Sequence, residues 1–225
     1  MAYTLQNIRD YVWSHLDLDA DEISTFLIDT WAREATIRIA NSRVRWPFFE
    51  QDWELTTVAG TQDYSFDGLS PAVDEITSVL GDERRLTWIG RDEGERRYLP
   101  VQQGHGNPTF FSTWASKLRF YPAPAGEEIL FLRGYRKVSD WVSGGAGSEP
   151  DFPDDFHDLV RLYVLASCYA QQEDTQMSQM YRDHYNEELD RLKKMYGDAP
   201  QAYPLVIGSG PRTNRPNRPM FPFEF

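Results

Sequence analysis

The stretch RWPFFEQDWELTTVAGTQDYSF, residues 45–66, marks the point where the hydrophobic period of the chain changes. Before it, apolar residues recur every three or four positions, which is typical of helices. Pro47 disfavours a helical conformation at Trp46, so we expect a helix to end there. After it come two runs rich in β-branched and aromatic residues, and the sequence predicts a hairpin of two strands joined at Ala59-Gly60.

Two helices are predicted upstream of this stretch. The first runs from about Thr4 to Leu16, with Thr4 as its N-cap, and the second from about Asp21 to Arg45. The second helix carries two apolar stripes, whereas a surface helix of a monomer needs one. We expect one stripe to enter the core and the other to meet another molecule, although burial of both by the same chain stays open. The stripes are Ile23, Phe26, Ile37 and Val44 on one side, and Leu27, Ile28, Trp31, Ala35 and Ile39 on the other.

Downstream, the pattern becomes that of strands. Residues 73–80 and 84–89 form two such runs with a turn between them, and the polar residues 90–98 form a helical turn or a loop. In TFFSTWASKLRFYPAPAGEEILFLRGYRKV, residues 109–138, apolar and charged residues alternate on either side of a turn at APAGE. We therefore expect an antiparallel sheet of four to six strands between about residues 52 and 138.

The helical period returns after a stretch rich in glycine and serine. One helix is predicted to open at Pro153, with acidic residues in its first turn, and another to run from about Asp174 to Tyr196 and end at Gly197. The predicted fold is α+β, a helical bundle with an inserted antiparallel β-sheet and an extended C-terminal arm. The expected divisions are residues 1–50 and 153–197 for the bundle, 51–138 for the β-rich domain, 139–152 for a flexible loop, and 198–225 for the arm.

The final residues, GSGPRTNRPNRPMFPFEF at 208–225, combine prolines, arginines and phenylalanines. Prolines favour an extended, polyproline-like conformation, whose turn of three residues matches the spacing of the arginines. In an extended chain the phenylalanines point to one side. We expect this arm to dock on another molecule, and the alternative is a disordered terminus. The candidate docking residues are Arg212, Arg215, Arg218, Phe221, Phe223 and Phe225.

Charge and composition narrow the function. The formal net charge is −12 and the arm is basic, so the rest of the chain is strongly acidic and unsuited to holding nucleic acid on a basic face. The single cysteine, Cys168, excludes an internal disulfide and is expected in the core. The N-terminus has the pattern of neither a signal peptide nor a membrane span.

Motifs for catalysis are few. Asp154 and His157 have a spacing that permits a shared metal, but acidic residues in a first helical turn are ordinary capping. The acidic pairs Asp74-Glu75 and Glu127-Glu128 leave open a glycosidase, and the seven tryptophans leave open a carbohydrate platform, with core packing as the plainer interpretation. No phosphate loop or dense metal cluster is found, and no cofactor is expected.

Three stretches together resemble one family, the head-to-tail adaptor proteins of tailed bacteriophages, also called tubular tail protein A in short-tailed phages. They are WPFFEQDWELTTVAGTQDYSF (46–66), GNPTFFSTWASKLRFYPAPAGEEILFLRGYRK (106–137) and PDFPDDFHDLVRLYVLASCYAQQED (150–174). The polar segment 90–106 matches nothing in the family pattern.

The resemblance implies a virion structural protein and no enzyme. It implies twelve copies in a ring on the portal protein, with the bundle against the portal, the β-rich part toward tail nozzle or tail-spike proteins, and DNA passing through the channel without specific binding. It places the protein at the head–tail interface of the virion, and in the host cytoplasm during assembly, with no membrane partner. Within such a ring, Leu27, Trp31 and Ile39 are candidate interface residues. A cell-wall polysaccharide hydrolase or a carbohydrate-binding module of a phage tail remains the alternative.

Overall fold

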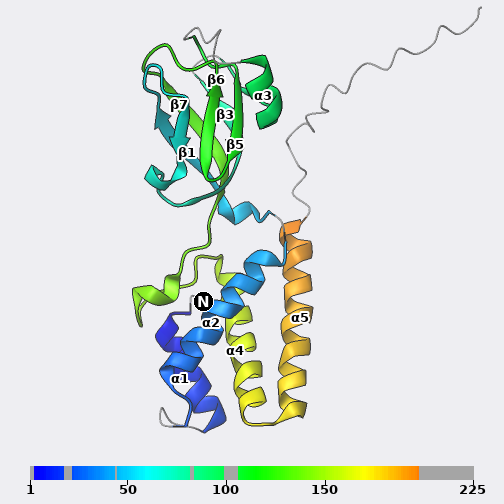
Figure 1. Cartoon of the computed structure of the whole chain (residues 1–225). Coiled ribbons are helices and arrows are strands. Elements are labelled where there is room, and N and C mark those ends of the chain that lie inside the picture. Colours follow the sequence, from blue (N-terminus) through cyan, green and yellow to red (C-terminus); the bar gives the residue numbers. More distant parts are fainter. Residues whose placement is uncertain (1–2, 18–21, 44, 82–83, 99–105, 198–225) are drawn as a thin grey trace, which may run out of the picture.

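The computed structural model describes residues 3–17, 22–43, 45–81, 84–98 and 106–197. They form two parts stacked end to end, a helical bundle and a β-rich part (Figure 1). The chain passes from the bundle into the β-rich part after its second helix and returns after its last strand (Figure 1). The predicted α+β class is confirmed, whereas the arm at 198–225 lies outside the described residues.

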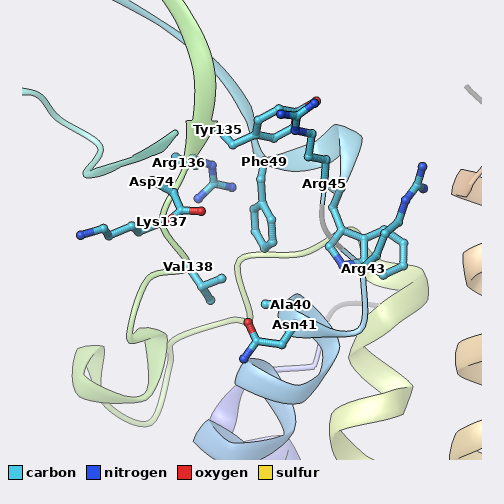
Figure 2. A pocket seen from close by; sticks show the side chains of 11 residues that line it. Ala40, Asn41, Arg43, Arg45, Phe49, Asp74, Tyr135, Arg136, Lys137 and Val138 are labelled. Atoms are coloured by element: carbon cyan, nitrogen blue, oxygen red, sulfur yellow. The ribbon is translucent and has the colours of Figure 1, made fainter. Parts of the chain in front are cut away.

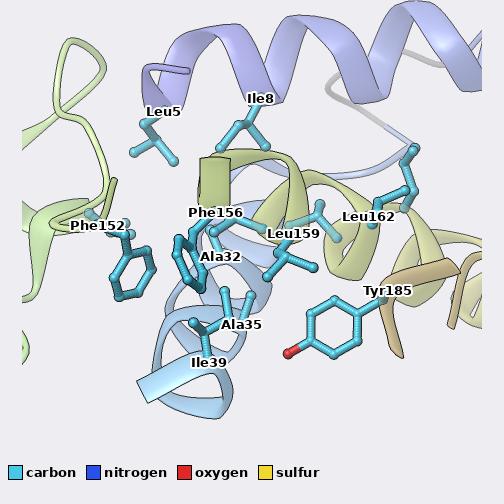
Figure 3. Close-up of a cluster of buried hydrophobic side chains, with 14 of the residues drawn as sticks. Leu5, Ile8, Ala32, Ala35, Ile39, Phe152, Phe156, Leu159, Leu162 and Tyr185 are labelled. Atoms are coloured by element: carbon cyan, nitrogen blue, oxygen red, sulfur yellow. The ribbon is translucent and has the colours of Figure 1, made fainter. Parts of the chain in front are cut away.

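Within the described residues, the bundle contains four α-helices, α1 (Leu5–Leu16), α2 (Thr25–Asn41), α4 (His157–Gln171) and α5 (Thr175–Gly197). Thr4 caps α1 as predicted, because its side chain accepts a hydrogen bond from the Asn7 amide. Helix α4 packs against all three others, and Figure 3 shows its side chains at the centre of the core. Its buried residues include Leu159, Leu162, Val164, Leu165 and Cys168.

Helix α2 is shorter than the expected span of about residues 21–45. It begins after Ser24, whose backbone is extended, and its last residue is Asn41. The carbonyl oxygen of Ile39 explains the end, because it accepts bonds from the Ser42 amide (3.2 Å), the Ser42 hydroxyl (2.7 Å) and the Trp46 indole (3.0 Å). The helix therefore ends several residues before Pro47, since these three groups occupy a carbonyl that a further helical turn would use.

The β-rich part has two sheets in place of the one predicted. The first has the order β1-β7-β3 and is antiparallel. The second has the order β2-β6-β5-β4, and its last pair is parallel. Side chains from both sheets share a core, which includes Trp53, Val79, Phe111 and Leu132. The strands are β1 (Glu50–Thr56), β2 (Asp63–Ser65), β3 (Val73–Leu80), β4 (Thr87–Trp88), β5 (Phe110–Trp114), β6 (Lys117–Tyr121) and β7 (Ile129–Arg136), with α3 (Arg91–Arg97) between β4 and β5.

The hairpin predicted at Ala59-Gly60 is wrong. Strand β1 pairs with β7 while β2 pairs with β6, so the turn carries the chain from one sheet to the other. The segment between β6 and β7 crosses between the sheets in the same way. Both crossings lie together, since the Thr57 amide bonds the Glu128 carbonyl and the Gly60 amide bonds the Pro124 carbonyl, each at 2.8 Å. Alternation shows that each strand has one buried face, and it cannot show whether the next strand pairs beside it or faces it.

The glycine-rich segment 139–152, expected as a flexible loop, is packed against the bundle. It contains a short 3₁₀ helix, Trp141–Gly144, whose first two residues are buried. The Trp141 indole donates to the Thr36 hydroxyl of α2 at 2.9 Å. Carbonyls of this segment also accept the first two amides of α1, from Leu5 at 2.8 Å and Gln6 at 2.9 Å. The segment therefore caps α1 and is anchored to α2.

An aromatic cluster joins the two parts of the molecule. Trp46 and Phe48, between α2 and β1, lie 5.3 and 5.1 Å from the Phe156 ring at the start of α4. The Phe156 ring lies 5.1 Å from Tyr196 at the end of α5. Phe49 and Phe152 complete the cluster. The end of α2, the start of α4, the end of α5 and the entry to β1 therefore meet in one packed group of rings.

Gly134 in β7 lies very close to the backbone of the neighbouring strand β3, and this close approach gives a first prediction. A Cβ atom there would lie 1.9 Å from the Glu75 carbonyl oxygen, opposite the irregular register of β3. We expect Gly134→Ala to lower the free energy of unfolding by about 3 kcal/mol or more, because the backbone of β3 has to shift. Gly126→Ala is the matched control, since nothing lies within 4 Å of its Cβ position. Equal urea unfolding curves for the two variants would contradict the close approach.

The anchor of segment 139–152 gives a second prediction. Thr36→Val removes the acceptor of the buried Trp141 indole N–H. We expect a loss of about 1–3 kcal/mol in the free energy of unfolding, since that donor stays buried without a partner. Thr30→Val is the control, because the Thr30 hydroxyl is exposed and bonds the Phe26 carbonyl of its own helix. A Thr36→Val variant as stable as the control would show that the indole bond contributes nothing.

Candidate functional site

The residues considered for metal or nucleophilic chemistry have structural roles. Among the described residues, no group of three or more His, Cys, Asp or Glu side chains is placed to hold a metal ion. His157 is buried, where its Nδ1 accepts the Tyr3 amide at 3.0 Å and its Nε2 lies 3.1 Å from the Phe152 carbonyl oxygen. Cys168 is fully buried as expected, and burial raises the pKa of its thiol to about 12.

One member of each acidic pair that left a glycosidase open is engaged in an ion pair. Both carboxylate oxygens of Glu75 accept from Arg45, at 2.7 and 3.1 Å. Glu128 accepts from Arg84 at 2.5 Å. The first pair joins the segment after α2 to β3, and the second joins the turn between β3 and β4 to the residue before β7.

Most tryptophans support the fold. The indole N–H groups of Trp13, Trp46, Trp53 and Trp141 donate to groups of their own chain. Trp88 and Trp114 are 55% and 52% exposed, and the Arg91 guanidinium lies 3.9 Å from the centre of the Trp114 ring. This cation–π contact covers part of an exposed ring on the second sheet.

A hollow of about 300 Å³ lies at the junction of the two parts (Figure 2). Its walls include the positively charged side chains Arg43, Arg45, Arg136 and Lys137, an unusual concentration in so acidic a chain. Arg136 forms a two-pronged ion pair with Asp151, and Arg43 donates to the Tyr196 carbonyl at 2.8 Å. The Arg45–Glu75 and Arg136–Asp151 pairs connect strands β3 and β7 to segments packed on the bundle, and the Arg43 bond connects the ends of α2 and α5. The hollow is therefore part of the joint between the bundle and the β-rich part.

Ion pairs also run along the outer faces of both sheets. Arg133 of β7 pairs with Asp52 of β1 at 2.8 Å, and Arg119 of β6 pairs with Asp63 of β2 at 2.5 Å. In each pair the hydrogen bonds from the guanidinium lower the pKa of the carboxyl group. These acids stay ionised and are matched by a neighbouring positive charge.

Large apolar side chains are exposed on both parts of the described structure. On the bundle they are Phe26 (71%) and Ile37 (56%) of α2, and Met180 (47%) and Met195 (56%) of α5. On the outer face of β7 they include Ile129 and Phe131. Isolated apolar residues are common on protein surfaces, but aligned ones on single helices indicate contact with another molecule. Beside Ile37 a mostly apolar hollow of about 280 Å³ opens between α2 and residues 138–141.

The predicted interface residues of α2 do not share one environment. Ile39 is fully buried in the core of its own chain, so it has no surface to offer a neighbour. Leu27 and Trp31 keep part of their surface exposed. Of the other predicted stripe, Phe26 and Ile37 are exposed, Ile23 is buried, and Val44 lies outside the described residues. The arm residues Arg212, Arg215, Arg218, Phe221, Phe223 and Phe225 lie outside the described residues.

Comparison with known proteins gives one family. A family model described as the SU10 adaptor protein matches residues 3–210, which is nearly the whole chain. No curated protein matched the chain. Among the described residues, no helix has the length and apolar character needed to cross a membrane.

The buried thiol makes stability dependent on alkaline pH. The pKa of Cys168 rises from about 9 to about 12 on folding. The unfolded chain therefore loses this proton first, and the free energy of unfolding falls as pH rises from 9 toward 12, by up to about 1.4 kcal/mol per pH unit. We expect Cys168→Ala to flatten this part of the profile, measured by urea unfolding at several pH values. An unchanged slope would contradict burial of the thiol; the burial-raised pKa of Tyr185 adds a slope that both proteins share.

Proposed function

The chain belongs to the SU10 adaptor protein family, as its sequence resemblance to phage head-to-tail adaptors predicted, and we propose that it forms the ring joining the portal vertex to the tail. The family is one of phage structural adaptors, and its members are components of the virion with portal and tail partners. The observation that carries the proposal is the family match, which extends across both the bundle and the β-rich part.

In the proposed ring, twelve copies sit on the portal protein and extend its DNA channel. The bundle faces the portal, and the β-rich part faces the tail nozzle or tail-spike proteins. The exposed apolar faces of the bundle support this role, since a protein that works alone gains nothing from presenting Phe26 and Ile37 to water. Leu27 and Trp31 remain proposed at the edge of the interface between copies.

The ring carries out no chemistry in this proposal, and DNA passes through it without specific binding. Acidic side chains that face the channel repel the phosphate backbone and keep DNA from adhering. The pairing of Asp52 and Asp63 with arginines limits how far the outer faces of the sheets contribute to that repulsion. The hydrolase alternative is not favoured, because the family is one of phage structural adaptors.

The arm attaches the ring in this proposal. Arg212, Arg215 and Arg218 pair with acids of the portal or of a neighbouring copy, and Phe221, Phe223 and Phe225 enter apolar sites there. Each buried phenylalanine contributes about 1.5–3 kcal/mol before the cost of ordering the chain. Repetition around a ring multiplies the effect through avidity.

Deletion of residues 208–225 tests the attachment. We expect the deleted chain to lose co-sedimentation with isolated portal rings by a factor of ten or more, since each copy loses several kilocalories of apolar contact. A variant with serine at Phe221, Phe223 and Phe225 should behave like the deletion. The control, with lysine at Arg212, Arg215 and Arg218, retains the charge and most of the binding. Binding of the deleted chain at the level of the full chain would refute the role of the arm.

A further inference from the structure

The outer faces of α2 and α5 are on opposite sides of the central helix. Helix α4 packs against both of them and lies between them in the bundle (Figure 1). Residues at helical spacing define the two faces. The α2 outer face is Phe26, Thr30, Arg33 and Ile37, and the α5 outer face is Met180, His184, Glu187, Arg191 and Met195. The exposed large hydrophobic residues of the bundle, as far as it is described, all lie on these two faces.

The two helices run in the same direction. Their C-terminal ends meet near the junction, where Arg43 after α2 donates to the Tyr196 carbonyl of α5 at 2.8 Å. A rotation about an axis along the bundle therefore brings the α2 outer face of one copy beside the α5 outer face of the next at the same height. Contacts between two different faces of the same protein form a closed ring when the rotation from one copy to the next is a whole fraction of a full turn.

Side chains of matching character lie at the same distance along the two helix axes. Arg33 lies seven residues after Phe26, and Glu187 lies seven residues after Met180. With the rise of an α-helix, both charged groups stand about 10 Å above the apolar residue that begins their face. When Phe26 is level with Met180, Arg33 is therefore level with Glu187, and opposite charges meet.

The charged groups are available for that contact. The Arg33 side chain is 41% exposed and uses its Nε to bond Asp140, so its terminal nitrogens still have donors to offer. Among the residues that the structure describes, Glu187 has no ion pair. An intermolecular pair here adds specificity for register more than affinity.

At the end of the two faces nearest the junction, the contact includes the apolar hollow beside Ile37. Met195 stands about 6 Å higher on its face than Ile37 does on the other, by the same helical rise. The hollow beside Ile37 extends in that direction, because Val138 lines it and also lines the junction hollow beyond the end of α2. Met195 has a long, flexible side chain suited to filling such an irregular site.

From this correspondence we propose that neighbouring copies contact each other through the α2 outer face of one and the α5 outer face of the next, with Phe26 against Met180, Arg33 paired with Glu187, and Met195 in the hollow beside Ile37. This rests on the proposed ring and assigns its subunit contact. Leu27 and Trp31 flank this contact on α2, and Ile39 takes no part in it.

Chemical cross-linking in assembled particles tests the proposal. Phe26→Cys and Met180→Cys are introduced together into the full chain, and particles are treated with a short bismaleimide. The buried Cys168 does not react, since its side chain is fully enclosed. We expect a ladder of covalent oligomers, because each copy links to two neighbours. Each single variant, as the matched control, should give no cross-linked product.

The outcomes separate this proposal from the proposed function. Particles that contain the double variant but show no ladder overturn the contact and leave the adaptor role intact. Covalent dimers from either single variant also overturn it, since they show that one face meets itself. Absence of even the wild-type chain from purified particles overturns the adaptor role and this contact with it.

Charge exchange provides a second test that needs no cysteine. Because Arg33 also pairs with Asp140, the changes are made in a chain that carries Asp140→Asn. In that chain, Arg33→Glu and Glu187→Arg are each expected to reduce incorporation into particles at least tenfold, and the two together to restore it. Far-ultraviolet circular dichroism of each chain verifies that the bundle has formed. If the paired exchange incorporates no better than the single changes, Arg33 and Glu187 do not meet and the proposed register is wrong.

Discussion

The aromatic cluster around Trp46 is the interaction on which the rest of the molecule depends. Its rings come from the segment between α2 and β1, from the start of α4 and from the end of α5. The Trp46 indole also bonds the carbonyl that ends α2. One packed group therefore ends a helix, begins a strand and holds two more helices against the point where the chain changes structure. The Arg45–Glu75 and Arg136–Asp151 pairs extend the joint on its polar side, where Figure 2 shows Arg45 and Arg136.

The rigidity of this joint matters for the proposed function, because an adaptor holds its two partners in a fixed relative position. A ring between two other assemblies fixes one partner relative to the other only if its own parts do not hinge freely. Packed aromatic rings and charge-assisted bonds limit such motion better than a polar linker of the same length. The bundle can then present its outer faces to neighbours while the β-rich part stays aligned with the component on its other side.

Local patterns in the sequence predicted local structure well. Thr4 and the apolar spacing after it were enough for α1, and the period around residues 174–197 was enough for α5. The end of α2 could not be predicted to the residue, because it depends on Trp46 reaching back seven residues to a carbonyl. The pairing of β1 with β7 depends on a partner about 80 residues away, and alternation within each strand carries no information about that partner.

The candidate interaction surface was predictable only in part. Two stripes on α2 could be read from helical spacing, but the choice of the inward stripe depends on how α4 and residues 139–152 cover that helix. Trp141 takes its place against Thr36 from more than 100 positions away. That contact leaves Ile37 at the rim of a hollow and encloses Ile39 in the core. The structure therefore buries one of the three predicted interface residues, Ile39, and the interface role of α2 itself stays a prediction.

A single-particle image of the head–tail junction tests the central claim most directly. The account predicts a ring of twelve copies between portal and tail, with the bundles side by side around a central channel and residues 208–225 of each copy bound to the portal or to a neighbouring copy. A junction without this chain, or copies whose residues 208–225 pack on their own globular part, would contradict it.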